Sequence, residues 1–567
     1  MAITPASSET EMSSALDTLH SHKEEWISIP MGERIAILEK LINRLVAVAP
    51  ELVAVSLEAK GFSKEGISAA QEWISGPYTI IRNLRRLERA LKQIASEGKP
   101  RIPGPILTRP NGQIVARVFP QDIYDRIFFS GITADVWMQS GVSIENLAET
   151  QAINYSKPVE GKIALVLGAG NVSGLAPTDA LHRLFVENQV VLLKLSPVNA
   201  YIGPIMKEIF QSLIEPGFLR VVYGGPEEGA YLCNHNQVDE IHVTGSDKTY
   251  NSVVFGSGEA GIGRKKEHNP LLTKPVTGEL GGVSPVIIIP GPWSDGDLAY
   301  HAELMATAMT DNAGYVCSVP RVILQHATWN GREKLLTHLR RILSQEHPRN
   351  AYYPGSLDQY ETFVKAHPEA ERFGKPGQGQ LPWTMVTGLD PDKMDDICFT
   401  TEAFFGFIAE ADIKAKDTAD FIDKAVNFAN NHLMGTLDAV IIVSHESLKD
   451  SEVAPALERA SANLRYGTIA INYHPAASWA SGVTPWGPFP NDDICNIQSG
   501  NGFVHNTMMF SQVQKVVFRA PFRCRPKPAW FLSRNGRAER VFKKLFYFEG
   551  SPSPMKVPGI LLDAIGR

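Results

Sequence analysis

The feature that most constrains the fold is a regular alternation of apolar and helix-like segments that begins near residue 161. Four apolar segments, KIALVLGAG, VVLLKLSP, LRVVYGG and EIHVTGS, read as buried strands. Segments with helical spacing of apolar residues, such as DALHRLFVEN and YIGPIMKEIFQSLI, separate them. Strands that alternate with helices at this spacing are typical of a parallel, doubly wound sheet. The sequence therefore predicts an α/β lobe over residues 160–281.

The flanking segments extend this prediction to the rest of the chain. Residues 9–98 carry apolar residues at helical spacing, and Gly61 is placed to end a helix. Residues 99–160 contain short strand-like pieces, of which 113–119 alternates well enough for a hairpin strand. A second α/β pattern continues to about residue 475, and a chain of 567 residues exceeds a single core. We therefore expect two Rossmann-like α/β lobes.

Composition excludes several classes of protein. The net charge of −6 provides no basic footprint for nucleic acid, and a chain with 44% hydrophobic residues is typical of a globular protein. The five cysteines show neither CxxC nor paired metal-ligand spacing, which argues against a zinc site and favours a reducing compartment. The amino terminus lacks a signal-peptide pattern, and no apolar run could span a bilayer. We therefore expect a cytoplasmic protein without a bound metal.

Cys317 ends the sequence DNAGYVC, where a helix-like segment meets a β-rich segment. A thiolate is strongly nucleophilic and can form a covalent intermediate with a carbonyl carbon. Cysteine is also among the residues most often buried for structural reasons, and its reactivity depends on its surroundings. Taken alone, Cys317 is therefore compatible with a structural role and with a catalytic one.

Four polar residues accompany Cys317 along the chain. Asn171 follows the first strand of the α/β lobe, and Lys194 ends the next strand. Glu279 precedes the cysteine in ELGG, and Glu402 follows it in TTEAFFGF. Each of them has an ordinary explanation when it is taken singly, as a turn residue or a solvated charge. Their joint occurrence in this order is what indicates a catalytic site.

A simple dinucleotide fingerprint is not the basis for this interpretation. The sequence GAGNVSG at 168–174 follows a strand, but its third glycine comes one place late. In addition, no acid ends the following strand, where Lys194 stands instead. A lone glycine pattern of this kind is a weak signal.

In their order, these residues resemble the aldehyde dehydrogenase superfamily over roughly residues 15–515. ELGG followed by Ser-Pro and a β-run is the most specific piece, and the NxGxxC pattern and the VVLLK strand follow it. The resemblance implies an α/β fold with two Rossmann-like lobes and a small β element for oligomerisation. The implied parts are a dinucleotide-binding domain (1–139 and 160–281), a catalytic domain (282–485), oligomerisation strands (140–159 and 500–516) and a basic C-terminal extension (517–567).

The resemblance also implies a reaction, the oxidation of an aldehyde to a carboxylic acid through a thiohemiacetal and a thioester. Cys317 would be the nucleophile, Asn171 and the Cys317 backbone N–H would stabilise the oxyanion, and Glu279 would be the general base. NAD or NADP would be the cofactor. The residues implied in binding it are Lys194, Ser196, Gly225, Ser246, Glu402 and Phe404, with Phe405 as the alternative to Phe404 beside the nicotinamide.

The chain departs from the usual family pattern at several positions. Ala169 and Gly170 replace a Pro-Trp pair before Asn171, which predicts a more open and flexible loop. Tyr315 replaces a glutamine two places before the nucleophile, and we expect this position to influence the choice of substrate. Pro197 stands where NAD-preferring members carry an acid, so no carboxylate there would repel a 2′-phosphate, which favours acceptance of NADP.

Two other functions remain open at this stage. In acyl-CoA reduction or CoA-acylating oxidation, the same cysteine thioester is exchanged with CoA instead of water. Glu279 favours hydrolysis, because only that reaction needs a general base. A third class, a binding protein without activity, has no chemical need for Cys317 and the four residues that accompany it.

The remaining expectations concern the substrate and partners. Phe404, Tyr473 and Trp479 suggest an apolar pocket, and hence a small-molecule aldehyde of medium or long apolar chain. We expect a homodimer or homotetramer. Residues 515–548 hold ten Lys/Arg against Glu539 as the one acid. This basic segment is compatible with weak contact to a membrane surface, and also with packing on the protein's own acidic surface.

Overall fold

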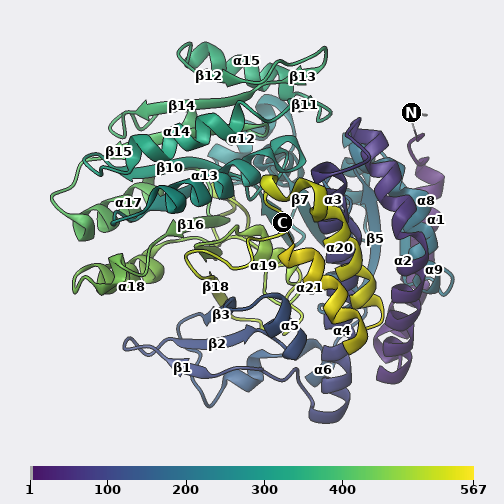
Figure 1. Cartoon of the computed structure of the whole chain (residues 1–567). Coiled ribbons are helices and arrows are strands. Elements are labelled where there is room, and N and C mark those ends of the chain that lie inside the picture. The colour runs from purple at the N-terminus through teal and green to yellow at the C-terminus, as the bar shows by residue number, and fades with distance from the viewer. Residues whose placement is uncertain (1–3, 567) are drawn as a thin grey trace.

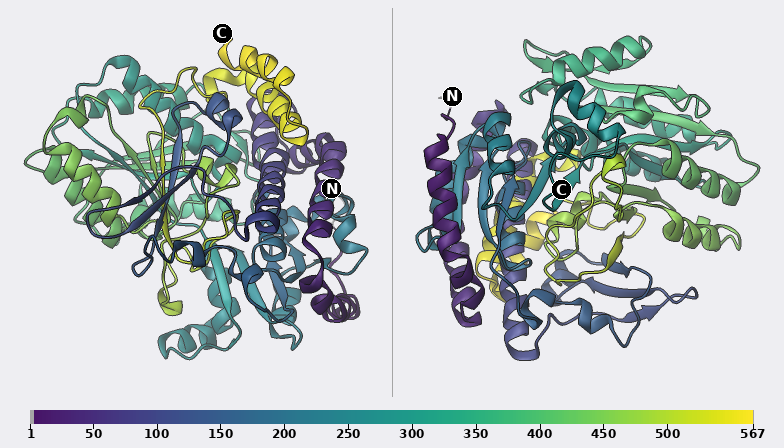
Figure 2. Two further views of the ribbon diagram at one scale, coloured as in Figure 1. Left: turned by 90° about the horizontal axis from the view of Figure 1, so that it is seen from below. Right: turned by 180° about the vertical axis from the view of Figure 1, so that it is seen from behind.

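The computed structural model describes residues 4–566, and two large sheets organise this part of the chain. One sheet has five strands and the other has eleven, and a third sheet of two strands is peripheral. Figure 2 shows the helices of the N-terminal segment on one side of the molecule and the large sheet on the other. The predicted α/β fold with two lobes of alternating helices and strands is confirmed.

The five-stranded sheet arises from the predicted alternation. Its order is β6-β5-β4-β7-β8 and all four pairings are parallel. Its central strands are entirely buried, because helices cover both faces and every residue of a strand then meets apolar neighbours. The strands are β4 (Ile163–Leu167), β5 (Val190–Leu195), β6 (Leu219–Tyr223), β7 (Glu240–Gly245) and β8 (Val276–Leu280).

The helices predicted in the N-terminal segment pack onto this sheet and onto one another. Trp26 of the first helix lies between Phe185 and Phe218, with ring centroids 5.4 and 5.1 Å away. Gly61 ends the second helix in the left-handed conformation, with φ of 63°, as the sequence predicts. The helices are α1 (Glu9–Ser28), α2 (Met31–Lys60), α3 (Ile67–Trp73) and α4 (Thr79–Glu97), and α7 (Leu175–Phe185) follows β4.

The eleven-stranded sheet carries the second α/β pattern (Figure 1). Its order is β1-β2-β3-β18-β17-β16-β9-β10-β15-β14-β12, and the run from β18 to β14 is parallel. Its parallel strands are β9 (Ser284–Ile288), β10 (Pro320–His326), β14 (Trp383–Leu389), β15 (Phe407–Ile413), β16 (Asp438–Ile442), β17 (Thr468–Ile471) and β18 (Val513–Arg519). Helices α13 (Asp295–Thr310), α14 (Arg332–Leu343), α17 (Thr418–His432) and α18 (Val453–Asn463) pack against them.

Three strands of the N-terminal third join the large sheet and not the five-stranded one, contrary to the predicted first domain. These strands are β1 (Ile106–Thr108), β2 (Ile114–Phe119) and β3 (Thr133–Met138), and β3 pairs antiparallel with β18. β2 confirms the hairpin strand expected within 113–119.

In place of the strand expected within 140–159, this stretch holds a 3₁₀ turn (Leu147–Thr150), a short helix (Ile153–Ser156) and an isolated antiparallel bridge between Gln151 and Phe510. The local reason is that Asn146 bonds the backbone of Gly141 and Ser143, and such side-chain bonds compete with a strand ladder. The partner strand expected within 500–516 is shifted to β18, which is paired on both edges.

The C-terminal segment, defined here as residues 520–566, packs across α3 and α4. Its main helices, α20 (Asn535–Gly550) and α21 (Val557–Ile565), are yellow in Figure 1. The apolar face of α20, which includes Phe542 and Phe546, is buried within the chain, and Lys527 pairs with Glu303. The segment therefore packs on the protein's own surface. No helix within residues 4–566 combines the length and apolarity that a membrane crossing needs.

Candidate active site

Cys317 lies in the turn between a 3₁₀ helix (Asp311–Gly314) and β10, and it lines a largely apolar cavity. Asn171 and Trp486 line the same cavity. Glu279, near the end of β8, lies close enough to Cys317 for its carboxyl group to act on the pKa of the thiol. The structure therefore brings together the three residues that the sequence predicts to be catalytic, from both lobes of the fold.

The turn before Cys317 has an unusual backbone. Asn312 and Ala313 have φ angles of 46° and 60°, and Gly314 follows with 85°. Left-handed residues of this kind are costly unless their surroundings fix them. Arg321, at the start of β10, donates to the carbonyl oxygens of Gly314 at 2.9 Å and Val316 at 3.3 Å. The guanidinium of Arg321 thus stabilises the turn before Cys317, a role that the sequence did not indicate.

Asn171 is 5% exposed and its loop is fixed. Its Nδ2 donates to the carbonyl oxygen of Tyr315 at 3.0 Å. Its own carbonyl oxygen accepts from Asn312 Nδ2 at 3.0 Å and from the Tyr352 hydroxyl at 2.8 Å. The prediction of an open, flexible loop is therefore wrong: polar contacts replace the missing Pro-Trp pair and tie Asn171 to the turn that carries Cys317.

A buried ion pair supports this arrangement. Lys60, at the end of α2, pairs with Glu72 and donates to Asn312 Oδ1 at 3.0 Å. Because both charges are buried, each depends on the other, and removal of one leaves an unpaired charge. The amide of Asn312 is thereby oriented with its Nδ2 toward Asn171.

Glu279 is 1% exposed and has the protonation behaviour of a general base. Burial raises its pKa to about 7, and hydrogen bonds from Trp486 and Cys317 oppose this rise. A base whose pKa lies near neutrality is charged often enough to accept a proton and basic enough to hold it.

Burial and the nearby carboxyl groups, of which Glu279 acts most strongly, raise the pKa of the Cys317 thiol well above its ordinary value. The thiol is therefore neutral near pH 7. It needs a proton acceptor when it attacks, because the thiolate is the nucleophile. Among the nearby carboxyl groups, that of Glu279 acts most strongly on the thiol and can be that acceptor.

The predicted cofactor residues lie at the carboxyl ends of the parallel strands, where nucleotides bind in such sheets. Lys194 ends β5, is 7% exposed and donates to the carbonyl oxygen of Gly224 at 2.6 Å. Gly225 and Ser246 cap helices α10 (Pro226–Asn234) and α11 (Asp247–Phe255). Ser196 caps the 3₁₀ helix Pro197–Ile202 and packs against Gly170.

Glu402 provides a test of whether these residues fit a dinucleotide. Its carboxylate packs so closely on Gly281 that a side chain at that glycine would overlap it. Its Oε1 is buried and has no hydrogen-bond partner within residues 4–566, and burial raises the pKa of Glu402 to about 8. A buried oxygen of this kind calls for a donor. The hydroxyls of a ribose are such donors, so the residues fit the implied group.

Two aromatic residues, Phe404 and Phe405, are predicted as alternatives beside the nicotinamide, and the structure places them in different surroundings. Phe404 packs on Tyr353 and Tyr315, with ring centroids 4.9 and 5.8 Å away. Phe405 is fully buried in the core between Phe363 and Phe407, so it is excluded from contact with a ligand. Neither Phe404 nor Tyr315 lines the cavity that contains Cys317. Tyr315 is therefore a core residue, and its expected influence on the substrate is not direct.

Sequence reasoning missed a carboxylate in the nucleotide region. Glu228 Oε2 accepts a hydrogen bond of 2.6 Å from the backbone N–H of Gly225. Its charge acts on Lys194, and both side chains contact Gly224. The local signal was the GGPEEG sequence, in which an acid three residues after a helix cap is typical of a capping pair. A negative charge is thus present near Lys194 although Pro197 is not an acid.

Comparisons with known proteins agree with this site. The profile described as the aldehyde dehydrogenase family matches residues 127–357. The chain is 31% identical to the chloroplastic betaine aldehyde dehydrogenase of Amaranthus hypochondriacus over 58% of each protein. Its matches to curated relatives span from about a quarter to about two thirds of their length.

Two solved structures share the fold at low sequence identity. An NADP-dependent glyceraldehyde-3-phosphate dehydrogenase from Bacillus halodurans, complexed with NADP, has a TM-score of 0.61 at 16% identity, covering 91% of this chain and 92% of its own. An NAD-dependent aldehyde dehydrogenase from Sinorhizobium meliloti has a TM-score of 0.59 at 17% identity, covering 92% and 89%. These two structures show that the chain has the fold of solved aldehyde dehydrogenases, and the family profile matches the part of the chain that carries Asn171, Glu279 and Cys317.

Proposed function

We propose that this protein oxidises an aldehyde to a carboxylic acid with NAD or NADP and water. The observation that carries the proposal is the nearness of the buried Glu279 to Cys317, which lines an apolar cavity together with Asn171. A nucleophile, a base with a pKa near neutrality and an amide donor are the groups that acyl chemistry requires. The match of residues 127–357 to the family profile and the cofactors named for structures of the same fold support the same reaction.

In the proposed reaction Glu279 accepts a proton twice, first from the Cys317 thiol and later from water. As the Cys317 sulfur attacks the aldehyde carbon, Glu279 accepts the thiol proton. The Nδ2 of Asn171 and the backbone N–H of Cys317 stabilise the oxyanion of the thiohemiacetal. NAD or NADP, when bound, accepts the hydride from that carbon. Glu279, once it has released its proton to solvent, deprotonates the water that hydrolyses the thioester, and the acid leaves.

The cofactor would lie along the carboxyl ends of the five-stranded sheet, which makes residues 160–281 the core of its domain. Lys194 and the α10 cap at Gly225 would bind the adenosine portion, Ser246 the pyrophosphate and Glu402 the nicotinamide ribose. Glu228 provides the negative charge that a 2′-phosphate would meet, and it can accept hydrogen bonds from ribose hydroxyls instead. This carboxylate favours NAD over NADP and reverses the preference inferred from Pro197.

The acyl acceptor is water in this proposal. CoA-acylating enzymes share the thioester but need no base to activate water, and here Glu279 is buried against the nucleophile. The apolar cavity also favours an apolar aldehyde of medium or long chain. Assembly into a homodimer or homotetramer remains a prediction; the exposed Ile106 and Leu107 of β1 lie on the edge strand of the large sheet, where a second copy could pair.

One assay tests the reaction. Wild type and the Cys317→Ala variant are incubated with NAD or NADP and a panel of aldehydes, with and without CoA, and reduced cofactor is followed by absorbance. We expect CoA-independent turnover that disappears in the variant. Strict dependence on CoA would establish the acylating reaction instead, and the absence of turnover under every condition would refute both.

A further inference from the structure

The cavity beside Cys317 is completed by the C-terminal segment. Phe542 of α20 and Trp530 line the same cavity as Cys317. The ring of Phe542 meets Tyr78 edge-on at 6.0 Å, and the ring of Trp530 meets Tyr473 at 5.6 Å. Together with His474, which contacts Trp530 at 5.7 Å, these residues form what we call the distal wall: Tyr78, Tyr473, His474, Trp530 and Phe542.

The C-terminal segment is firmly attached, so the distal wall has a fixed position. Lys527 pairs with Glu303 at 2.6 Å, and the backbone N–H of Ser533 donates to the same carboxylate at 2.8 Å. At the other end of α20, Glu549 pairs with Arg82 at 2.6 Å, and both partners are buried. A buried ion pair resists separation, because either charge alone would be left without a partner.

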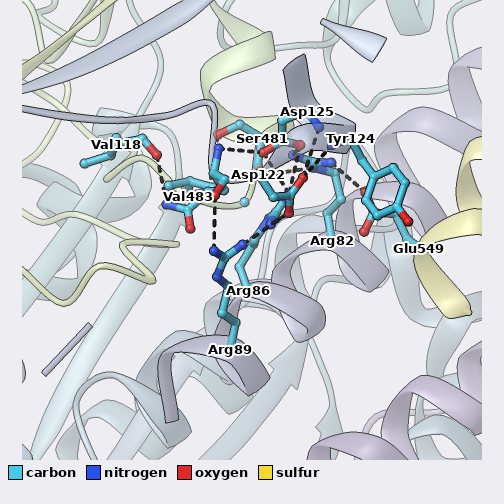
Figure 3. A network of polar contacts seen from close by, with 12 residues as sticks. Arg82, Arg86, Arg89, Val118, Asp122, Tyr124, Asp125, Ser481, Val483 and Glu549 are labelled. Carbon is cyan, nitrogen blue, oxygen red and sulfur yellow. Dashed lines mark hydrogen bonds and ion pairs between the residues drawn. The ribbon is translucent and has the colours of Figure 1, made fainter. Parts of the chain in front are cut away.

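The charges around the distal wall cancel (Figure 3). Arg82 lines the cavity, but its guanidinium is fully engaged with Asp125, Glu549 and the carbonyl oxygen of Ser481. The surrounding cluster contains three arginines and three carboxylates and therefore has no net charge: Arg82, Arg86, Arg89, Asp122, Asp125 and Glu549. The acidic residue Asp311 also lines the cavity. A negatively charged substrate group would therefore enter an apolar cavity whose lining offers it no free positive charge, which is unfavourable.

Two buried polar atoms of the distal wall lack a partner within residues 4–566: the hydroxyl of Tyr78 and Nε2 of His474. Their side chains are 3% and 7% exposed. The Nδ1 of His474 accepts from the backbone N–H of Ala476 at 3.0 Å, so the proton of the neutral ring is on Nε2. Burial lowers the pKa of His474 to about 4, so the ring is neutral near pH 7. Both atoms can therefore bind a neutral hydrogen-bonding group.

We propose that the C-terminal segment forms part of the substrate site, with Phe542 and Trp530 limiting the length of the aldehyde. The site takes an aldehyde without a negative charge, with an apolar body and a neutral hydrogen-bonding group, such as a hydroxyl, that reaches Tyr78 and His474. This inference rests on the proposed aldehyde oxidation, and it deepens it by naming the substrate class.

The length limit is tested with paired variants of one helix. Phe542→Ala enlarges the cavity, whereas Phe546→Ala removes the same side chain from α20 where it packs on Trp73, outside the cavity. The measurement is kcat/KM for a series of straight-chain aldehydes. We expect Phe542→Ala to raise the ratio of long-chain to short-chain kcat/KM by about tenfold. One methylene group more or less in an apolar pocket changes kcat/KM by at least about this factor. Phe546→Ala leaves the ratio unchanged.

Equal changes in both variants, or none in either, would overturn the proposal. Phe542→Leu, which keeps most of the volume, provides the folding check: if Phe542→Ala melts early, Phe542→Leu must still shift the ratio in the same direction. If the ratio of long-chain to short-chain kcat/KM shifts in neither Phe542→Ala nor Phe542→Leu, the distal wall does not limit the length of the aldehyde.

A second readout separates this inference from the proposed reaction. The rate at which N-alkyl maleimides of increasing chain length modify Cys317 is followed by mass spectrometry, without cofactor or turnover. Wild type is expected to exclude the long reagents and Phe542→Ala to admit them. If no aldehyde is oxidised but this difference appears, the proposed reaction fails while the wall stands. If turnover occurs and the difference is missing in both assays, the wall fails.

The chemical class is tested with matched aldehydes. An alkanal, its terminal hydroxy derivative and its terminal carboxylate derivative are compared at one chain length. We expect the charged aldehyde to have the lowest kcat/KM, and Tyr78→Phe to weaken the hydroxy aldehyde about tenfold relative to the alkanal, as expected for one lost hydrogen bond. Preference for the charged aldehyde, or equal effects of Tyr78→Phe on both neutral ones, would refute the assignment.

Discussion

The indole N–H of Trp486 donates a hydrogen bond of 3.1 Å to Oε1 of Glu279, and both side chains are 1% exposed. Burial alone would favour the neutral carboxyl group, whereas this bond favours the carboxylate. The two effects together leave the pKa of Glu279 at about 7. Trp486 therefore tunes the pKa of the proposed base through this hydrogen bond.

Replacing Trp486 by phenylalanine should move the acidic limb of the pH profile. Trp486→Phe keeps an aromatic ring but removes the donor, so the pKa of Glu279 rises above about 7. Because only the carboxylate can accept a proton, the midpoint of the acidic limb of kcat shifts to higher pH by about one unit, the equivalent of one hydrogen bond to a charged group. The measurement is kcat between about pH 6 and about pH 9.

The Glu279→Gln variant is the control for this shift. It should lose most activity and the limb with it, because no titrating base remains. A profile of Trp486→Phe with an unmoved midpoint and only a lower plateau would show that the tryptophan acts through packing.

Glu402 should make the protein less stable as the pH rises. Burial raises the pKa of this acid in the folded state from 4.5 to about 8, so the folded protein binds a proton that the unfolded chain releases. The contribution of Glu402 to the free energy of unfolding is therefore largest below about pH 4.5, falls between about pH 4.5 and about pH 8, and levels off above about pH 8. Glu402→Gln removes this loss, so its melting temperature exceeds that of wild type more at about pH 8.5 than at about pH 5.5.

A matched substitution on the surface tests the specificity of this effect. Glu361 is exposed, and Glu361→Gln should give the same small difference at both pH values. If Glu402→Gln also shows no dependence on pH, Glu402 does not carry the buried titration. Since the variant also replaces one oxygen of the carboxylate assigned to the ribose by an amide NH₂ group, higher stability should accompany weaker cofactor binding.

Local patterns in the sequence predicted what local contacts determine. The apolar runs of β4 and β5 are buried along their whole length, so the strands could be recognised from composition alone. Asn171, Glu279 and Cys317 could be found because each lies at a strand or helix boundary within a recognisable motif. Local composition does not always suffice: residues 255–275 are rich in glycine and charge, which is typical of an exposed loop, yet they contain α12 (Gly258–Lys266).

What sequence reasoning missed are contacts between distant segments. Trp486 and Glu279 are hydrogen-bonded although they are 207 positions apart in the sequence, and Glu549 and Arg82 are paired although they are 467 positions apart. Neither pair has a spacing rule, because the contact depends on how sheets and helices pack. The same holds for Phe542, whose basic neighbours suggested a surface helix while its ring lines the cavity. Tertiary packing, and not propensity, decides these positions.

Neutralising Glu228 should increase the use of NADP. The carboxylate lies at the α10 cap and acts on Lys194, so a 2′-phosphate bound there would be repelled. Glu228→Gln keeps the shape of the side chain and removes the charge. We expect the ratio of the NADP and NAD dissociation constants to fall about tenfold, the size of one partly screened charge contact. Titration calorimetry with each cofactor measures this ratio without turnover.

The adjacent acid serves as a control. Glu227 is exposed, and Glu227→Gln should leave the ratio of dissociation constants near its wild-type value. If both substitutions change the ratio equally, the effect is one of general charge, and Glu228 does not occupy the ribose region.

Asn312 should be essential for the oxyanion site although it is outside the reaction itself. Its Nδ2 bonds the carbonyl oxygens of Asn171 and Tyr315, and its left-handed backbone sets the turn before Cys317. Asn312→Gly permits the same backbone but removes the amide, whereas Asn312→Ala removes the amide and strains the backbone. We expect kcat to fall about 10- to 100-fold in Asn312→Gly, because a displaced donor stabilises the oxyanion less. Asn312→Ala should fall further and melt earlier. Stopped-flow measurement of the first turnover, with the KM for cofactor as the unchanged reference, checks this, and wild-type rates in Asn312→Gly would mean that the turn needs only its backbone conformation.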